Sequence, residues 1–128
     1  MFRVYLAGGM KDGWQDRFML TLDGVEYFDP RTHGLTDPAA YTEWDLRHVR
    51  LADAVVAYMD PANPSGYGLS LEIGYAHALG KRIVFIDAFG ADWRGKYFDM
   101  HRQLCEVAPS IAHAQAIIQK CKNMRAAT

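Results

Sequence analysis

The segment GYGLSLEIGYAHALGK, residues 66–81, places a single carboxylate, Glu72, one turn inside a helix that begins among glycines. It lies among the apolar residues Leu69, Leu71, Ile73 and Ala76. The positive end of a helix stabilises an ionised carboxylate, whereas apolar surroundings oppose ionisation. A carboxylate held in that balance can act as a nucleophile or as an acid/base. The alternative is that Glu72 only binds backbone N–H groups of the preceding glycine loop.

Two further side chains are candidates for the same chemistry. Tyr5 lies inside the apolar run 2–8, and a buried phenol needs a hydrogen-bond partner, which is either a catalytic carboxylate or any convenient acceptor. Asp45 shares a helical face with Tyr41 and His48, at spacings of four and three residues. It therefore either points inward or is a surface acid paired with His48.

Other motifs for chemistry are absent from the sequence. The stretch AGGMK after the first apolar run lacks the GxGxxG and GxxxxGK[ST] signatures of dinucleotide and P-loop sites. The five histidines show no metal-binding spacing, so no metal is expected. Cys105 and Cys121 have no CxxC spacing, which predicts reduced thiols in a cytoplasmic protein.

The elements that must position these residues follow an alternating pattern. Apolar or β-branched runs predict strands over 2–8, 25–29, 53–59 and 82–87, and helical patterns occupy 14–22, 38–52, 68–79, 97–106 and 110–123. Asp37 and Pro38 form a helix start, and Gly80 stands where a helix ends.

Strands separated by helices pair in parallel through right-handed crossovers, which predicts a doubly wound, three-layer α/β/α fold. Ligands in such sheets bind beyond the carboxyl ends of strands, where the strand order reverses. With the order 2-1-3-4, the loops after the first and third strands flank one crevice. Glu72 then lies one helical turn beyond that crevice.

Length and charge restrict the function further. A chain of 128 residues predicts one domain, and the net charge of −1, with scattered Lys and Arg, argues against a nucleic-acid partner. The sequence contains no run of about 18 apolar residues, so no membrane span is expected. The apolar stretch at the amino end is too short for a signal peptide.

Three segments in order, YLAGGM (5–10), WDLRHVRLADAVVAYMD (44–60) and GLSLEIGYAHALGKRIVFI (68–86), resemble the nucleoside 2-deoxyribosyltransferase family. The resemblance covers residues 3 to about 100 and implies a flavodoxin-like fold without a cofactor. It also implies cleavage of N-glycosidic bonds. The deoxyribose then passes to another nucleobase or, in relatives that act on nucleoside 5′-monophosphates, to water.

The resemblance implies roles for individual residues. Glu72 matches the nucleophile that forms a covalent glycosyl-enzyme, Tyr5 the tyrosine that positions it, and Asp45 the aspartate that holds the base. Met100 resembles a methionine that one subunit lends to its neighbour's site, and Asp99 lies near the residue that grips the sugar 5′-hydroxyl. The expected working unit is therefore a homodimer or higher homo-oligomer with shared active sites.

Substrate contacts are expected mainly from the glycine loops. The expected set is Gly8, Gly9, Met10, Lys11, Ser65, Gly66, Gly68, Asp99 and Met100. Gly66 stands where family members carry Asp or Ser, and Gly9 replaces a hydroxyl residue of the monophosphate-cleaving relatives, whereas Lys11 supplies a basic group. An acidic Asp99 near the sugar 5′ end would repel a phosphate, which favours nucleosides over 5′-monophosphates.

Four hypotheses follow. The first is a deoxyribosyltransferase that exchanges nucleobases, and the second is an N-glycosidase that transfers the sugar of a nucleoside 5′-monophosphate to water. The third is a non-catalytic module that binds a nucleotide or flavin. The fourth is a structural domain in which Glu72 only anchors a loop.

Overall fold

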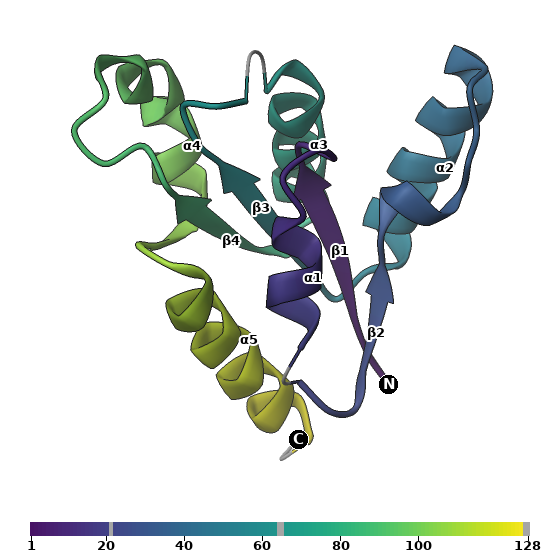
Figure 1. Ribbon diagram of the computed structural model, residues 1–128. Coiled ribbons are helices and arrows are strands. Elements are labelled where there is room, and N and C mark those ends of the chain that lie inside the picture. The colour runs from purple at the N-terminus through teal and green to yellow at the C-terminus, as the bar shows by residue number, and fades with distance from the viewer. Residues whose placement is uncertain (21, 64–65, 127–128) are drawn as a thin grey trace.

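A parallel five-stranded sheet forms the centre of the computed structural model, which describes residues 1–20, 22–63 and 66–126 (Figure 1). The strands are β1 (Phe2–Gly8), β2 (Val25–Phe28), β3 (Ala54–Met59), β4 (Arg82–Asp87) and β5 (Glu106–Ala108). Their order is β2-β1-β3-β4-β5, and all neighbours pair in parallel. The order reverses between β1 and β3, as predicted, and this reversal makes their carboxyl ends the expected ligand position.

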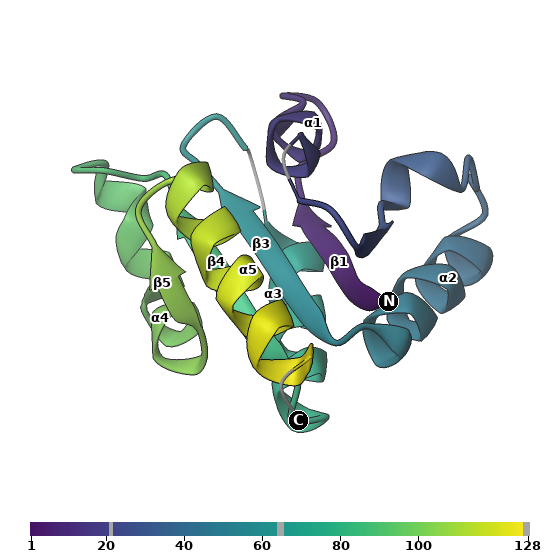
Figure 2. The ribbon, with the colours of Figure 1, turned by 90° about the horizontal axis from the view of Figure 1, so that it is seen from below.

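Helices cover both faces of the sheet. They are α1 (Trp14–Met19), α2 (Pro38–Leu51), α3 (Tyr67–Ala78), α4 (Asp99–Leu104) and α5 (Ile111–Ala126), with 3₁₀ turns at Pro30–Thr32 and Trp93–Phe98. Side chains of α1 and α5 pack on one face and those of α2 and α3 on the other. Figure 2 shows α5 and α3 on opposite sides of the strands. The predicted three-layer α/β/α fold is confirmed.

The central strands β1, β3 and β4 are largely apolar on both faces, because helices cover both faces of the sheet. Along β1, Val4 and Leu6 face the α1/α5 layer, whereas Tyr5 and Ala7 face the α2/α3 layer, and all four are fully buried. This explains the continuous apolar runs of the sequence, which parallel sheets require. It also puts a phenol, Tyr5, at the centre of the layer that holds α3.

The helix ends follow the expected chemistry. The Asp37 side chain accepts a hydrogen bond from the Ala40 backbone N–H at 3.0 Å, and Pro38 begins α2. Gly80 follows α3 with a φ of 72°, a conformation that favours glycine. No helix in the described part of the chain is long and apolar enough to cross a membrane.

Several boundaries differ from the predictions. The stretch 106–108 is strand β5, paired with β4 through Phe85 and Val107, whereas the sequence pattern placed residue 106 in a helix. A three-residue edge strand is too short to show a period. The helix expected over 97–106 is the shorter α4, preceded by the 3₁₀ turn Trp93–Phe98. The helix α1 ends at Met19 rather than residue 22, and α5 extends to Ala126.

Candidate active site

The loops after β1 and β3 meet at the carboxyl edge of the sheet and enclose a hollow of about 340 Å³. Its lining residues are Gly9, Met10, Lys11, Asp12, Tyr58, Asp60, Ala62 and Asn63. Three of the expected substrate contacts, Gly9, Met10 and Lys11, are thus brought together. The hollow lies where the strand order reverses, which is the position predicted for a crevice.

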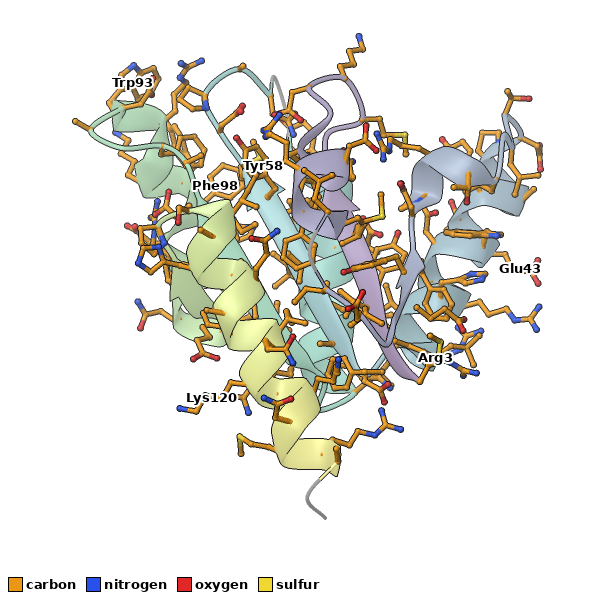
Figure 3. All side chains as sticks on the ribbon, turned by 60° about the horizontal axis from the view of Figure 1, so that its bottom comes forward. Arg3, Glu43, Tyr58, Trp93, Phe98 and Lys120 are labelled. Carbon is orange, nitrogen blue, oxygen red and sulfur yellow. The ribbon has the colours of Figure 1, made fainter. Side chains whose placement is uncertain are left out.

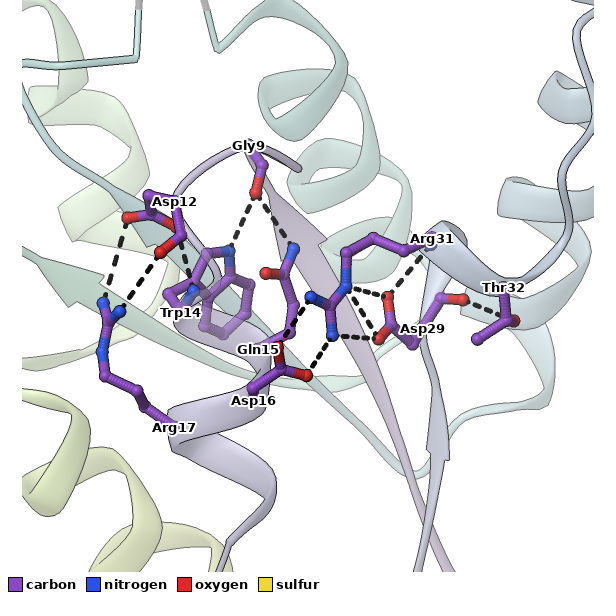
Figure 4. Close-up of polar contacts among 9 residues, drawn as sticks. All are labelled: Gly9, Asp12, Trp14, Gln15, Asp16, Arg17, Asp29, Arg31 and Thr32. Atoms are coloured by element: carbon purple, nitrogen blue, oxygen red, sulfur yellow. Dashed lines mark hydrogen bonds and ion pairs between the residues drawn. The ribbon is translucent and has the colours of Figure 1, made fainter.

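The loop after β1 is fixed by hydrogen bonds to its backbone (Figure 4). The Gly9 carbonyl accepts from Trp14 Nε1 at 3.2 Å and from Gln15 Nε2 at 3.0 Å. Gly8 has a φ of 150°, and a Cβ there would lie 2.7 Å from the Tyr58 carbonyl oxygen. Glycine therefore permits the close approach of the β1 and β3 loops.

A charged network ties the end of β2 to α1 beside this loop (Figure 4). Arg31 donates to the buried carboxylate of Asp29 at 2.7 Å and to Asp16 on α1 at 2.8 Å. The Asp29 side chain also accepts from the Arg31 backbone N–H at 3.0 Å. The segment that follows β2 is consequently anchored against α1.

Glu72 is partly buried on the first turns of α3 and accepts a hydrogen bond from the fully buried Tyr5 hydroxyl. The partner of Glu72 is therefore a side chain of the central sheet. In the residues that the structure describes, the glycine loop supplies no backbone amide to this carboxylate. This arrangement disfavours the reading of Glu72 as a loop anchor.

Burial and neighbouring charges control protonation at this contact. Burial, with a smaller contribution from the Asp45 charge, raises the pKa of Glu72 from 4.5 to about 8, although the hydrogen bond from Tyr5 opposes the shift. Burial, followed by the charge of Glu72, raises the pKa of Tyr5 far above its usual range. Tyr5 is thus a permanent donor, and Glu72 is a carboxyl group with an unusually high affinity for a proton.

Asp45 points inward from α2, and its side chain is 22 % exposed. Burial raises its pKa, whereas His33, His48 and the Tyr5 hydroxyl lower it. The side chain that faces Asp45 Oδ1 is His33, whose Nε2 lies 3.5 Å from it. The surface alternative, an Asp45 paired with His48, is therefore wrong: His48 Nδ1 instead contacts the Trp44 carbonyl at 2.7 Å.

The remaining expected contacts are dispersed. Gly66 precedes α3 with a φ of 84°, and Gly68 is exposed in the first turn of that helix. Ser65 lies outside the described residues. Asp99 is exposed and bound to Arg102 at 2.8 Å, and Met100 is 78 % exposed.

A second hollow, of about 450 Å³, opens between α3 and the segment after β4. Aromatic side chains dominate its lining: Tyr67, Phe89, Trp93, Tyr97 and Phe98. Figure 3 shows Trp93 at the outer tip of this segment and Phe98 closer to the sheet. Its inner wall contains Ser70, whose Oγ lies 2.6 Å from His101 Nε2.

The Glu72 carboxylate lines neither of these two hollows within the described chain. Residues of a helix project about 100° apart, so Ser70 and Glu72 point to nearly opposite flanks of α3. The α4 segment, which contacts Ser70, therefore lies across α3 from Glu72. The structure does not bring Asp99 or Met100 to the Glu72 of their own chain.

His33 and Asn63 are among the residues at this edge of the sheet that sequence reasoning missed. His33 follows β2 and contacts Asp45, and Asn63 lines both hollows. Both residues come shortly after strands. The rule that ligands bind beyond strand ends could therefore have identified them. No group of His, Cys, Asp and Glu suited to a metal ion occurs among the residues placed by the structure.

Comparisons with known proteins agree with this fold. Among solved structures, a 2-deoxyribosyltransferase from Leishmania mexicana is 23% identical with a TM-score of 0.56, and the match covers 67% of this chain but only 64% of that one. The 2-deoxyribosyltransferase from Bacillus psychrosaccharolyticus is 21% identical with a TM-score of 0.60, and 69% and 74% of the two chains are covered. The CMP N-glycosidase from Clostridium botulinum is 23% identical with a TM-score of 0.60, over 91% of this chain and 97% of that one.

At these identities the structural matches establish the fold. No curated protein sequence matches the chain significantly. A family model described as nucleoside 2-deoxyribosyltransferase like matches residues 1–88, which include β1, α2, α3 and most of the sheet. The chain therefore belongs to the nucleoside 2-deoxyribosyltransferase-like family.

Proposed function

We propose that this protein cleaves the N-glycosidic bond of a 2′-deoxynucleoside and transfers the deoxyribosyl group to another nucleobase through a covalent intermediate on Glu72. The observation that carries the proposal is the contact between the buried Tyr5 hydroxyl and Glu72, with Asp45 beside it. Membership of the family and the deoxyribosyltransferases among the structural relatives support the substrate class.

The reaction follows from the chemistry of a retaining glycosyl transfer. A Glu72 oxygen attacks the anomeric carbon while the bond to the base breaks, and the base leaves with the bonding electrons and accepts a proton from Asp45. A second base then attacks the same carbon and gives its ring N–H proton to the Asp45 carboxylate, while the Glu72 carboxylate departs. Each step passes through an oxocarbenium-like transition state, and two inversions give overall retention.

Tyr5 has a specific part in this scheme. It donates to Glu72 Oε2, so the other carboxylate oxygen is the one available for attack. The hydrogen bond lowers the pKa of Glu72 against the effect of burial and thereby favours the ionised form that a nucleophile requires.

A second candidate is an N-glycosidase that transfers the sugar of a nucleoside 5′-monophosphate to water. The CMP N-glycosidase matches this chain over nearly the full length of both proteins, whereas each transferase match leaves about a third of this chain uncovered. The charge argument against a phosphate is also weakened, because Arg102 binds the Asp99 carboxylate. Lys11 at the first hollow supplies a cation.

The test combines product analysis with mass spectrometry of the intact protein. The chain is incubated with a deoxynucleoside and a different free base and, separately, with nucleoside 5′-monophosphates. Base exchange supports transfer, and release of a sugar phosphate supports the second candidate. A deoxyribosyl or sugar-phosphate mass gain that maps to Glu72 supports the covalent intermediate in either case.

Two glutamine variants, one at the proposed nucleophile and one matched control, complete the test. Glu72→Gln should lose the mass gain and at least a thousandfold in rate, because the nucleophile is removed. Glu43→Gln, on the exposed side of α2, should keep both. Equal turnover by Glu72→Gln and the wild type would refute the proposal.

A further inference from the structure

His33 is held in one protonation pattern by the backbone that follows it. Its imidazole is 8 % exposed, and Nδ1 accepts a hydrogen bond from the Leu35 backbone N–H at 2.9 Å. A neutral imidazole carries its single hydrogen on the nitrogen that does not accept. The hydrogen of His33 is therefore on Nε2.

The orientation of the His33 ring is fixed from another side as well. Trp44 packs edge-on against it, with ring centroids 4.9 Å apart, and Trp44 itself stacks on His48 at 3.7 Å. This packing and the Leu35 hydrogen bond aim Nε2 away from solvent and toward α2.

The atom that Nε2 faces is Asp45 Oδ1, at 3.5 Å. Both atoms are buried, and in the described residues neither makes a hydrogen bond that meets ordinary geometry. A buried donor and a buried acceptor left apart are costly, and a small rotation of the Asp45 side chain would join them. Catalytic hydrogen bonds are often long in the free protein and tighten when substrate binds.

Asp45 needs such a donor because the hydrogen of Tyr5 is already committed. The Tyr5 hydroxyl lies close to both Asp45 and Glu72, but it has one hydrogen and donates it to Glu72. A second donor on the far side of Asp45 removes the competition between the two carboxylates.

We propose that His33 is a positioning residue, which binds Asp45 Oδ1 through Nε2–H and thereby turns the other Asp45 oxygen toward the departing nucleobase while the Tyr5 hydrogen stays on Glu72. This inference rests on the proposed function, because it assigns Asp45 to the leaving base. It makes the segment after β2 part of the active site, joined to α2, β1 and α3 by one chain of polar contacts.

Two substitutions separate positioning from a purely structural role. His33→Gln can place an amide N–H near the Nε2 position and so keep the donor to Asp45, although it loses the acceptor for Leu35. His33→Asn can keep the acceptor for Leu35, but its side chain is too short to reach Asp45. We expect kcat to fall about ten- to a hundredfold in His33→Asn, as misplaced catalytic groups typically cause, and to be largely restored in His33→Gln. The opposite order would overturn the inference, because it would mean that the Leu35 contact is what matters.

A double-substitution cycle tests whether His33 acts through Asp45. In an Asp45→Ala background, His33→Asn should change kcat by less than about twofold, since the group that it positions is gone. Independent, multiplicative losses would overturn the inference. A wild-type protein without any glycosyl transfer or hydrolysis would instead refute the proposed function.

The geometry itself is tested without activity. Long-range ¹H–¹⁵N NMR of the histidine rings reports which His33 nitrogen carries the hydrogen. We expect Nε2–H in the wild type and a changed His33 signal in Asp45→Ala. A hydrogen on Nδ1, or a signal unaffected by Asp45→Ala, would overturn the inference even if the enzyme is active.

Discussion

In the proposed mechanism, the surroundings of Glu72 favour its reactivity at the expense of the stability of the folded protein. Burial raises its pKa to about 8, and the nearby Asp45 charge adds to the effect. A surface glutamate would be stable but surrounded by water, whereas a buried one is poorly solvated and ready to share electrons with an electrophilic carbon. The hydrogen bond from Tyr5 reduces the free-energy cost of burying an ionised Glu72, because the hydroxyl donates to the carboxylate.

The raised pKa of the buried Glu72 carboxyl group predicts how the stability of the folded protein depends on pH. The pKa of Glu72 is 4.5 when unperturbed and about 8 in the folded protein, so the folded chain holds this proton more tightly than the unfolded chain. The contribution of Glu72 to stability is therefore most favourable below pH 4.5 and is lost as the pH rises through about 8. Glu72→Gln, which cannot ionise, should be more stable than the wild type above pH 8 by about 1–3 kcal/mol, less than the full shift because the side chain is partly exposed.

Urea unfolding of both proteins at pH 5 and pH 9 measures this difference. The gain should be small at pH 5 and larger at pH 9. Glu43→Gln is the control, because Figure 3 shows Glu43 pointing outward from α2, and it should change little at either pH. A Glu72→Gln variant that is less stable than the wild type at pH 9 would contradict the shifted protonation of Glu72.

At the scale of elements, the position of Glu72 depends on the start of α3, and that start depends on the backbone conformation of Gly66. Gly66 has a φ of 84°, which L side chains rarely adopt. A Cβ added there would lie 2.9 Å from Met59 Cε and 3.0 Å from Phe98 Cζ. Gly66 therefore lets the start of α3 pack closely against Met59, the last residue of β3, and Phe98.

Gly66→Ala should destabilise the protein by about 1–3 kcal/mol, because it strains the backbone at a positive φ and forces the Met59 and Phe98 side chains to shift. It should also lower the rate, since a displaced α3 moves Glu72 away from Tyr5. Gly74→Ala in the same helix is the matched control: a Cβ there meets nothing within 4 Å. It should stabilise the protein by about 1 kcal/mol through helix propensity. Thermal unfolding of the two variants checks both signs, and a neutral Gly66→Ala would show that the helix start tolerates a side chain.

The elements that the sequence predicted correctly are those with strong local signals. The strand Ala54–Met59 is apolar and β-branched, and α2 carries the Asp37–Pro38 start, so pattern and turn chemistry agreed. The strand Glu106–Ala108 carries no such signal, because three residues on an edge depend on pairing with β4. Local pattern specifies local structure, and short edge strands are specified by their neighbours.

The candidate site was predictable only in part for a related reason. Glu72 and Tyr5 stood out because an acid and a phenol interrupt apolar runs, and the structure joins them. His33 lies in an irregular segment with no period, and its contact with Asp45 depends on the path of the chain after β2. Pairings between irregular segments and helices are tertiary facts that spacing along the chain does not encode.

At the scale of the whole molecule, the protein exposes aromatic and apolar surface beside α3. Tyr67, Trp93, Tyr97 and Met100 are all well exposed, and three of them border the second hollow. Clustered exposed apolar side chains of this kind mark interaction surfaces. Within one chain this surface lies across α3 from Glu72, so Met100 does not reach the Glu72 of its own chain. We propose that the working unit is at least a dimer in which this surface is buried.

Met100→Asp tests the proposed dimer and its role in activity. Met100 makes little contact within its own chain, because 78 % of it is exposed, so a charge there should leave the fold intact. The introduced charge should be costly in a buried interface. Light scattering should therefore show a shift toward the 14.4 kDa monomer. Activity should fall at least tenfold in parallel, since a shared site needs both copies.

Leu20→Asp is the control, because Leu20 is equally exposed at the end of α1, on the opposite face of the sheet. Its substitution should change neither the oligomeric state nor the activity. A wild-type protein that is monomeric and fully active would show that one chain completes its own site, with the segment after β4 left free for a different purpose.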